Sequence, residues 1–224
     1  MIKYIKNALE FAVDLLYPEL CMFCDGALGG TDNEKRYLTC KECFNEISIA
    51  HKANNVFCLL KYEGKAENII KQFKYNRQKR YAYSAGLILA KFAASDTLLG
   101  DILIPIPLYT ERQKKRGYNQ AEVICKAIAN ETKLPIAKGL KRVKNTPALY
   151  GLTRKQREKA ILGAFEYIHT TDEITIKGKT IILVDDILTS GATFNECAKV
   201  LIANGAMEVK LITFAYTQMY NEAP

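Results

Sequence analysis

Apolar runs alternate with helical patterns along the second half of the chain. Ile181 to Val184 form a continuous aliphatic run, and apolar residues then recur at helical spacing from Phe194 to Ile202. An earlier run at 101–104 precedes a second helical pattern, from Ala121 to Ala129. A strand that is apolar on both faces is typical of a parallel sheet covered by helices on either side. The pattern therefore predicts an α/β fold, a parallel sheet flanked by helices, with a binding edge at the carboxyl ends of its strands.

Acidic and small residues follow the first of these strands. Asp185 and Asp186 end the apolar run, and Thr189 to Thr193 lead into the helix. Small residues let the backbone approach a ligand, and the free N–H groups and positive dipole end of a helix N-terminus attract phosphate. Adjacent carboxylates repel phosphate but suit sugar hydroxyls or Mg²⁺. A turn in which Asp186 or Thr189 merely caps the helix is the alternative, but the unbroken order of strand, acids, turn and helix favours a ribose-phosphate site.

This segment resembles the 5-phosphoribosyl-1-pyrophosphate (PRPP) motif of type I phosphoribosyltransferases. The resemblance implies that the two aspartates are the catalytic pair that holds the ribose hydroxyls, and that the following loop wraps the 5-phosphate. The PRPP-binding residues predicted in this segment are Asp185, Asp186, Ile187, Leu188, Thr189, Ser190, Gly191, Ala192 and Thr193.

Two Cys-x-x-Cys pairs near the N-terminus have the spacing of a zinc ribbon. Cys21 pairs with Cys24 and Cys40 with Cys43, with fifteen residues between the pairs. Four thiolates fill the coordination sphere of Zn²⁺, so the predicted role is structural. The glycine-containing segment between the pairs predicts a hairpin too poor in apolar residues for a core of its own, so metal must hold it together. One alternative is a set of disulfides in an exported protein, which would require a signal peptide. The other is a thioredoxin-type redox pair, which does not explain the second Cys-x-x-Cys pair.

The first 20 residues predict an amphipathic helix. Apolar residues recur there at helical spacing, but Glu10 and Asp14 interrupt them. We expect this helix to pack on the adjacent domain, with a membrane surface or a partner as the alternative. Because no apolar run reaches about 18 residues, we expect no integral membrane insertion, and a cytoplasmic location that is at most peripheral at the inner face of the membrane.

The net charge of +8 is clustered at 71–80, 112–116 and 138–159. Such clusters can neutralise the pyrophosphate of a small substrate or can form a track for nucleic-acid phosphates, and composition does not separate the two. Tyrosines among these charges could stack on bases, although packing is their commoner role. Cys58, Cys125 and Cys197 fall on apolar stripes and predict buried small hydrophobes. The two histidines lie in no serine or carboxylate constellation, which gives no support to a hydrolytic triad.

A proline loop follows the strand at 101–104. Pro105 and Pro107 lack N–H groups, so neither a sheet nor a helix continues through them, and the loop is expected at the same binding edge. Arg112, Arg116 and Asn119 come next, before the helical pattern.

The order of motifs along the whole chain resembles the ComF family of competence-associated proteins. The matching elements are the four-cysteine ribbon, Phe73-Lys74-Tyr75, Pro105-Ile106-Pro107, Arg116-Gly117-Tyr118-Asn119-Gln120 and the PRPP motif. A flexible-loop element is matched in part, by Arg142, Thr146, Leu152-Thr153, Arg157 and Gly163-Ala164-Phe165. Leu149 stands where the family usually has glutamine, and Ala160 where it has asparagine.

The resemblance implies a type I phosphoribosyltransferase-like domain at 51–224, after an N-terminal helix and a small four-cysteine zinc ribbon at 1–50. It further implies binding of PRPP with Mg²⁺ and an association with natural competence and uptake of single-stranded DNA. As an enzyme the protein would be a phosphoribosyltransferase, in which an acceptor that the sequence does not specify takes the phosphoribosyl group and pyrophosphate leaves. The pyrophosphate would then contact Pro105, Ile106, Pro107, Leu108, Arg112 and Arg116, and Arg154 or Arg157 would close over it from the flexible loop. The alternative is a non-catalytic adaptor that keeps the fold and binds single-stranded DNA and proteins of the competence machinery.

Overall fold

The computed structural model describes residues 18–53, 55–75, 78–93, 100–146, 151–169 and 174–217. The chain separates into two compact units, with the boundary between Ile47 and Ser48. The predicted N-terminal helix falls mainly on residues 1–17, which lie outside the described residues, as do Arg77 and Leu149.

The smaller unit carries both cysteine pairs on turns and short helices. An isolated antiparallel bridge joins Leu20 to Ala27 around the first pair. The predicted hairpin between the pairs is wrong beyond that bridge, because helix α2 (Asp32–Tyr37) occupies the rest of the segment. A capping box explains the helix: the Thr31 side chain accepts from the N–H of Glu34, and the Glu34 side chain accepts from the N–H of Thr31. Helix α3 (Lys41–Asn45) begins inside the second pair, with Cys40 as its N-cap.

The larger unit is built on the parallel sheet that the apolar runs predict. Its five strands lie in the order β1-β2-β7-β6-β3, and all neighbours are parallel except β1 and β2. Their bounds are β1 (His51–Ala53), β2 (Val56–Lys61), β3 (Ile102–Pro105), β6 (Thr180–Leu188) and β7 (Glu208–Tyr216). Parallel neighbours require crossover connections, which the helices supply. The α/β architecture is confirmed.

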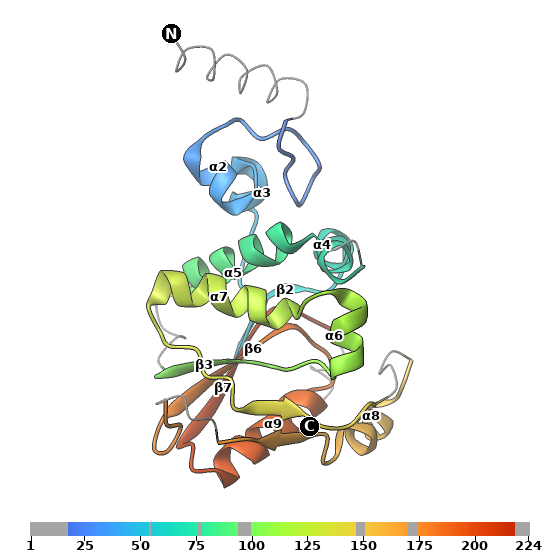
Figure 1. Cartoon of the computed structure of the whole chain (residues 1–224). Helices are drawn as coiled ribbons and strands as arrows, with labels where there is room; N and C mark the ends of the chain where they lie inside the picture. Colours follow the sequence, from blue (N-terminus) through green and yellow to red (C-terminus); the bar gives the residue numbers. More distant parts are fainter. Residues whose placement is uncertain are drawn as a thin grey trace. The chain divides into compact units, whose positions relative to one another are not determined.

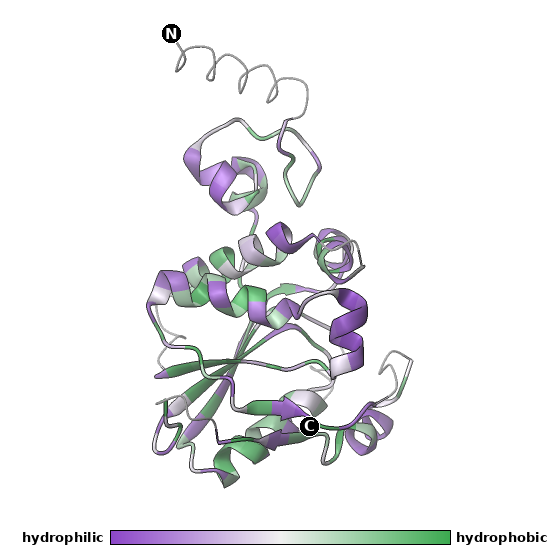
Figure 2. Cartoon of the chain, in the orientation of Figure 1, coloured by the Kyte–Doolittle hydropathy of each residue, from purple (hydrophilic) through white to green (hydrophobic). Residues whose placement is uncertain are grey.

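Helices cover both faces of this sheet (Figure 1). One face carries α4 (Gly64–Tyr75), α5 (Lys79–Ala93) and α7 (Gln120–Thr132). The other carries α9 (Ala192–Ala203), beside which lie α8 (Arg154–Ile161) and a separate hairpin of β4 (Leu140–Arg142) and β5 (Phe165–Tyr167). A short helix, α6 (Thr110–Arg116), follows the proline loop and is hydrophilic along most of its length (Figure 2).

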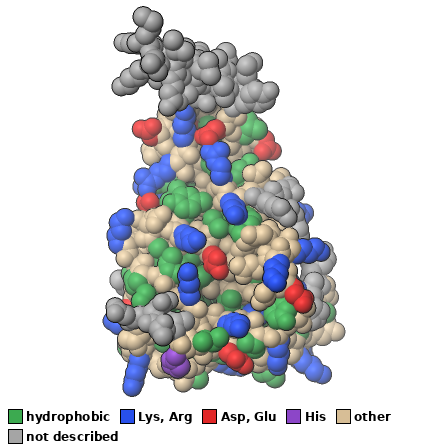
Figure 3. Space-filling model, in the orientation of Figure 1, with side chains coloured by type: hydrophobic (Ala, Val, Ile, Leu, Met, Phe, Trp, Pro, Cys, Tyr) green, Lys and Arg blue, Asp and Glu red, His purple; other side chains and the backbone are tan. Residues whose placement is uncertain are grey.

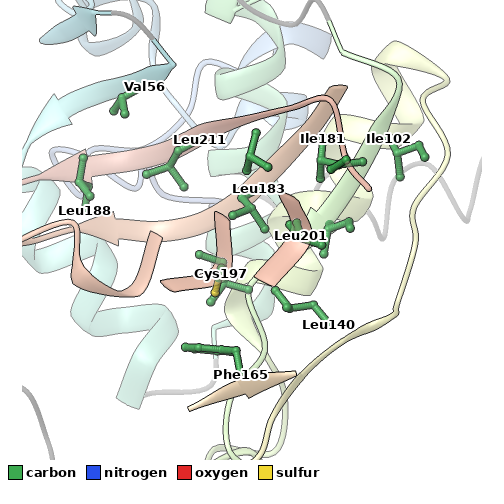
Figure 4. Close-up of a cluster of buried hydrophobic side chains, with 14 of the residues drawn as sticks. Val56, Ile102, Leu140, Phe165, Ile181, Leu183, Leu188, Cys197, Leu201 and Leu211 are labelled. Atoms are coloured by element: carbon green, nitrogen blue, oxygen red, sulfur yellow. The ribbon is translucent and has the colours of Figure 1, made fainter. Parts of the chain in front are cut away.

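Strand β6 supplies apolar side chains to both layers. Ile181 and Leu183 join the buried cluster that includes Cys197 and Leu201 of α9 and Phe165 of the hairpin (Figure 4). Ile182 and Val184 alternate with them and are also buried, toward the α5 and α7 layer. Cys58, Cys125 and Cys197 are buried as predicted. The strand is therefore fixed in register from both sides, because a one-residue slip would exchange its two faces.

The two aspartates lie inside β6 and not after its end. β6 pairs with β7 as far as Leu188. Its other neighbour, β3, ends its pairing at Val184, opposite Pro105. Beyond Val184, β6 has therefore lost its ladder partner on the β3 side while it is still held by β7. This half-free strand end is where the acids are placed.

Gly86 sets the distance between α5 and α7, and we expect Gly86→Ala to destabilise the protein. A Cβ there would lie 2.6 Å from the carbonyl oxygen of Ile124 and 2.6 Å from Cβ of Ala127. Alanine gains about 1 kcal/mol of helix propensity over glycine, but a clash with backbone costs about 1–3 kcal/mol. Urea unfolding should show a net loss of free energy of unfolding, whereas Lys91→Ala at an exposed position of the same helix should change it by less than about 0.5 kcal/mol. A gain in stability for Gly86→Ala would contradict this packing.

Candidate functional site

The two aspartates of β6 point into different layers and have different partners. The side chain of Asp186 is 8% exposed, and its Oδ1 lies 3.1 Å from Nζ of Lys74 on α4. Asp185 is half-buried, and its Oδ1 accepts the N–H of Asp186 at 2.8 Å. Asp185 lines a small pocket together with Thr193 and Phe194 of α9, which places Asp185 on the α9 side. The acids are thus brought together at one edge, as predicted, while each contacts a separate helical layer.

Burial makes the first acid hard to ionise. Burial, followed by the charge of Asp186, raises the pKa of Asp185 to about 7, against smaller lowering effects of Lys74 and Arg142. A carboxyl group with this pKa changes charge near neutral pH. Ligand cations or hydroxyl donors at this position would favour its charged form.

The turn after β6 joins a glycine in the left-handed region to the start of a helix. Gly191 adopts φ +79, which glycine reaches without strain, and α9 begins at Ala192 with no side-chain cap. The first N–H groups of α9 therefore have no capping side chain from this turn. A small pocket lies beside the turn, and the residues that line it are Ile106, Asp185, Ile187, Leu188, Thr189, Gly191, Thr193, Phe194, Leu211 and Thr213. The pocket joins the acid, the turn and the proline loop, three segments that the sequence assigned to one site.

Asn119 anchors the proline loop at this edge. Its Nδ2 donates to the carbonyl oxygen of Ile106 at 3.0 Å, and its Oδ1 accepts the N–H of Ala121 as the N-cap of α7. The N–H of Ile106 in turn donates to the carbonyl oxygen of Val184 at 2.9 Å. Ile106 is thus fixed from both sides, immediately before the point where β6 carries the acids.

The residues on either side of Asn119 hold the end of α4. The Tyr118 hydroxyl and the Gln120 Nε2 both donate to the carbonyl oxygen of Phe73, the latter at 3.3 Å. Burial raises the pKa of Tyr118 to about 12, so this donor keeps its proton across the physiological range. Phe73 directly precedes Lys74, so these bonds position the lysine that pairs with Asp186. Both motifs are visible in the sequence, but no local pattern indicates that the residues around Asn119 hold Phe73.

The predicted pyrophosphate arginines contact protein groups of their own. Arg116 Nη1 donates to Gln120 Oε1 at 3.0 Å, and Arg112 Nη2 donates to the carbonyl oxygen of Thr146 at 3.2 Å. Of the flexible-loop pair, Arg154 forms an ion pair with Glu158 at 3.1 Å, and Arg157 is buried, with its Nε donating to the carbonyl oxygen of Leu152. Contact of these four arginines with PRPP stays a prediction.

The four cysteines converge as a zinc site requires. Their sulfur atoms all lie within 4.8 Å of one another, and Cys24 Sγ is 3.9 Å from Cys40 Sγ. Tetrahedral Zn²⁺ with Zn–S bonds of about 2.3 Å separates its sulfurs by about 3.8 Å. The N–H of Phe23 donates to Cys21 Sγ at 3.4 Å and that of Cys43 to Cys40 Sγ at 3.5 Å. Such bonds favour thiolates, so the donor set fits a structural Zn²⁺.

Comparison with known proteins agrees with this geometry. Residues 115–224, which include Asp185, Asp186 and the turn after β6, match the family model "Phosphoribosyl transferase domain". The chain is 35% identical over 114 residues to "Competence protein F" of Haemophilus influenzae, covering 50% of this chain and 49% of that protein. It is 32% identical over 104 residues to "Competence protein ComFC" of Bacillus subtilis, covering 46% of this chain and 39% of that one. These matches support the resemblance to the ComF family.

Other relatives carry names that refer to DNA. The "DNA utilization protein YhgH" of Escherichia coli K12 is 27% identical over 149 residues, which is 64% of this chain and 63% of that protein. The matched regions thus span about two-fifths to two-thirds of these relatives: 39% of ComFC, 49% of Competence protein F and 63% of YhgH. Among solved structures, adenine phosphoribosyltransferase of Leishmania donovani matches at 11% identity with a TM-score of 0.43, over 76% of this chain and 87% of that chain.

None of the helices in the described ranges is both long enough and apolar enough to cross a membrane.

We expect Asp185→Asn to stabilise the protein at alkaline pH. The pKa of Asp185 is higher in the folded protein than in the unfolded chain. The stability that this group contributes is therefore present below about pH 4 and is lost as the pH rises through about 7. Asparagine keeps the oxygen that accepts the Asp186 N–H and removes the buried charge. Urea unfolding should show a gain of about 1–3 kcal/mol at pH 8 that disappears near pH 4.

Asp101→Asn is the matched control for this substitution. Asp101 lies beside the opposite, N-terminal end of β3, where its Oδ2 accepts the N–H of Thr180. It should give no gain that grows with pH. Parallel pH profiles for the wild type and Asp185→Asn would contradict the buried charge.

Metal removal should unfold the smaller unit. We expect about one Zn²⁺ per chain of reduced protein and a loss of folded structure around the cysteines after chelation. Cys43→Ser should lose the metal, because three thiolates leave the sphere open. Cys58→Ser, a buried cysteine of the other unit, should keep it. The measurement is metal analysis with circular dichroism, and equal zinc content in the two variants would refute the site.

Proposed function

We propose that the protein binds PRPP with Mg²⁺ and transfers its phosphoribosyl group to an acceptor. The observation that carries this proposal is the half-free end of β6, where Asp185 and a glycine turn at an uncapped helix start line one pocket and Asp186 is the next residue of the strand. The acids suit the ribose hydroxyls and the turn suits the 5-phosphate. The match of residues 115–224 to a phosphoribosyl transferase domain supports the same assignment.

The reaction is a displacement at the anomeric carbon of the ribose. A lone pair of the acceptor forms the new bond to that carbon while the bond to the pyrophosphate oxygen breaks, and pyrophosphate leaves with the bonding electrons. A proton carried by the acceptor nucleophile passes to solvent or to a neighbouring base. Bound Mg²⁺ supplies positive charge for the departing pyrophosphate.

The protein residues contribute chiefly by positioning in this mechanism. Asp185 and Asp186 hold the ribose, Thr189 to Thr193 hold the phosphate, and the loop at 105–108 borders the pyrophosphate. Asn119 fixes that loop through Ile106, so the pyrophosphate side is set before the substrate arrives. Preorganised contacts of this kind lower the barrier because no reorganisation accompanies the reaction.

A second candidate is an adaptor role in DNA uptake. The names of the relatives, which refer to competence and DNA utilization, favour it. The charge of +8 is compatible with DNA, but several lysines and arginines of the clusters have protein partners, among them Lys71 with Glu67 and Lys74 with Asp186. Basic side chains are spread over the face drawn in Figure 3 and do not gather in one stripe. Tyr118, one of the interleaved tyrosines, is buried and cannot stack on a base.

Calorimetric titration of PRPP with Mg²⁺ tests the proposed function. Wild type should bind, and the variant Asp185→Asn with Asp186→Asn should bind at least about 100-fold more weakly, because each of the two carboxylate hydrogen bonds to sugar hydroxyls contributes about 1.5–3 kcal/mol. Asp101→Asn should bind as the wild type does. Failure of wild type to bind PRPP at about 1 mM would overturn the proposal.

A parallel titration with oligothymidine separates the adaptor role. Direct DNA binding should weaken steeply with salt and should not depend on the two aspartates. DNA binding without PRPP binding would favour the adaptor over the enzyme.

A further inference from the structure

A buried glutamine contacts two segments that lead to different parts of the site. Gln120, in the first turn of α7, is 1% exposed and uses both ends of its side-chain amide. Its Oε1 accepts from Nη1 of Arg116 at 3.0 Å, and its Nε2 donates to the carbonyl oxygen of Phe73 at 3.3 Å. A guanidinium only donates and a carbonyl group only accepts, so one orientation of the amide satisfies both neighbours.

The two neighbours of Gln120 serve different parts of the proposed substrate. Arg116 is the last residue of α6, and it is one of the arginines predicted to contact the pyrophosphate. Phe73 directly precedes Lys74, whose Nζ lies 3.1 Å from Oδ1 of Asp186, one of the acids proposed to hold the ribose. One rigid amide therefore joins the arginine of the pyrophosphate side to the segment that carries the lysine of the ribose side.

The bond from Gln120 to Phe73 is not needed to satisfy the end of α4. Carbonyl groups in the last turn of a helix lack a partner within the helix, and Phe73 is buried, so its oxygen requires a donor from elsewhere. The Tyr118 hydroxyl already supplies that donor. Ordering a buried glutamine as a second donor costs side-chain entropy, which a redundant cap does not explain. The contact with Arg116 gives the amide a role that the tyrosine cannot supply.

We propose that Gln120 is a positioning residue that couples the pyrophosphate part of the site to the ribose part. This inference rests on the proposed function and adds cooperativity between the two halves of the substrate. A pyrophosphate on Arg116 fixes the guanidinium and with it the amide, so the end of α4 that carries Lys74 is already ordered when the ribose binds. By reciprocity, the ribose favours binding of the pyrophosphate by the same factor.

The coupling distinguishes the substrate from the product. PRPP carries both halves, so its binding includes the contribution of the coupling. The phosphoribosyl product lacks the pyrophosphate and is held by the ribose and phosphate contacts alone. Departure of pyrophosphate therefore weakens the hold on the product and favours its release, a step that often limits turnover.

Titrations with the two halves of the substrate test the inference. Ribose 5-phosphate is titrated by calorimetry into the zinc-loaded full chain with Mg²⁺, once without and once with inorganic pyrophosphate. We define the ratio of the two dissociation constants as the coupling factor. Wild type should give a coupling factor of about 5 or more, and the reverse titration should give the same value. Equal dissociation constants in wild type would overturn the inference.

Three variants assign the coupling to the amide. Gln120→Met keeps the length of the side chain without its hydrogen bonds, so the coupling factor should fall to about 1. Tyr118→Phe removes the other donor to Phe73 and leaves the amide in place, so it should keep the coupling factor even where the affinity for ribose 5-phosphate falls. Gln78→Met changes an exposed glutamine and should behave as wild type. An equal loss in the first two variants would mean that both residues merely hold the helix end, and the assignment would be wrong.

Gln120→Glu decides the question if Gln120→Met does not fold, as judged by circular dichroism. Glutamate still accepts from Arg116 but has no N–H group for Phe73, so pyrophosphate should bind while the coupling factor falls. Full retention of the coupling factor in either variant would show that the coupling runs through the shared Mg²⁺, against the inference.

PRPP titration of wild type separates the two proposals. Wild type that does not bind PRPP removes the proposed function and this inference together. PRPP binding without coupling between its two halves removes the inference alone.

Discussion

The placement of two carboxylates in a buried strand is the constraint on which the rest of this site depends. Helices cover both faces of β6, and its residues are apolar as far as Val184. The next two residues, Asp185 and Asp186, carry charge beyond the point where β3 stops pairing with β6. Each charge therefore needs a cation from its own side. Lys74 meets Asp186 in one layer, and Arg142 acts on Asp185 in the other. Asp185 nevertheless remains destabilised in its ionised form, as is common where a protein retains charged groups for binding.

Much of the surrounding architecture holds these compensating groups in place. Tyr118 and Gln120 donate to the same carbonyl group, that of Phe73, and so fix the last turn of α4 that carries Lys74. Asn119, between them in the sequence, donates instead to the carbonyl oxygen of Ile106 and so fixes the proline loop. One short polar segment at the start of α7 thus positions both Lys74 and the proline loop. Because a helix start must satisfy its own N–H groups as well, the segment combines a cap with two tethers.

The sequence predicts those parts of the fold whose physics is local. A continuous aliphatic run, a small-residue turn and a helical stripe identify β6 and α9, and the spacing of Cys21, Cys24, Cys40 and Cys43 predicts their convergence. Helix α6 is missed because its sequence has no apolar stripe; early Glu111 and late lysines, followed by Gly117 in the left-handed region, are the signals that identify it. Helix α2 is likewise detectable only from its capping box.

The burial of Arg142 cannot be read from its neighbours, because Lys141 and Arg142 differ only in which face of a two-stranded hairpin they occupy. The pairing of Lys74 with Asp186 joins distant segments, and no local pattern encodes it.

The opposed orientation of the two acids has a mechanical consequence. Asp186 belongs to the layer of α4 and α7, while Asp185 belongs to the layer of α9 and the small hairpin. A sugar that contacts both acids would link these two layers, which the sheet otherwise separates. Its binding free energy then adds to the cohesion of both layers at once, so an occupied site resists local opening on either face of the sheet.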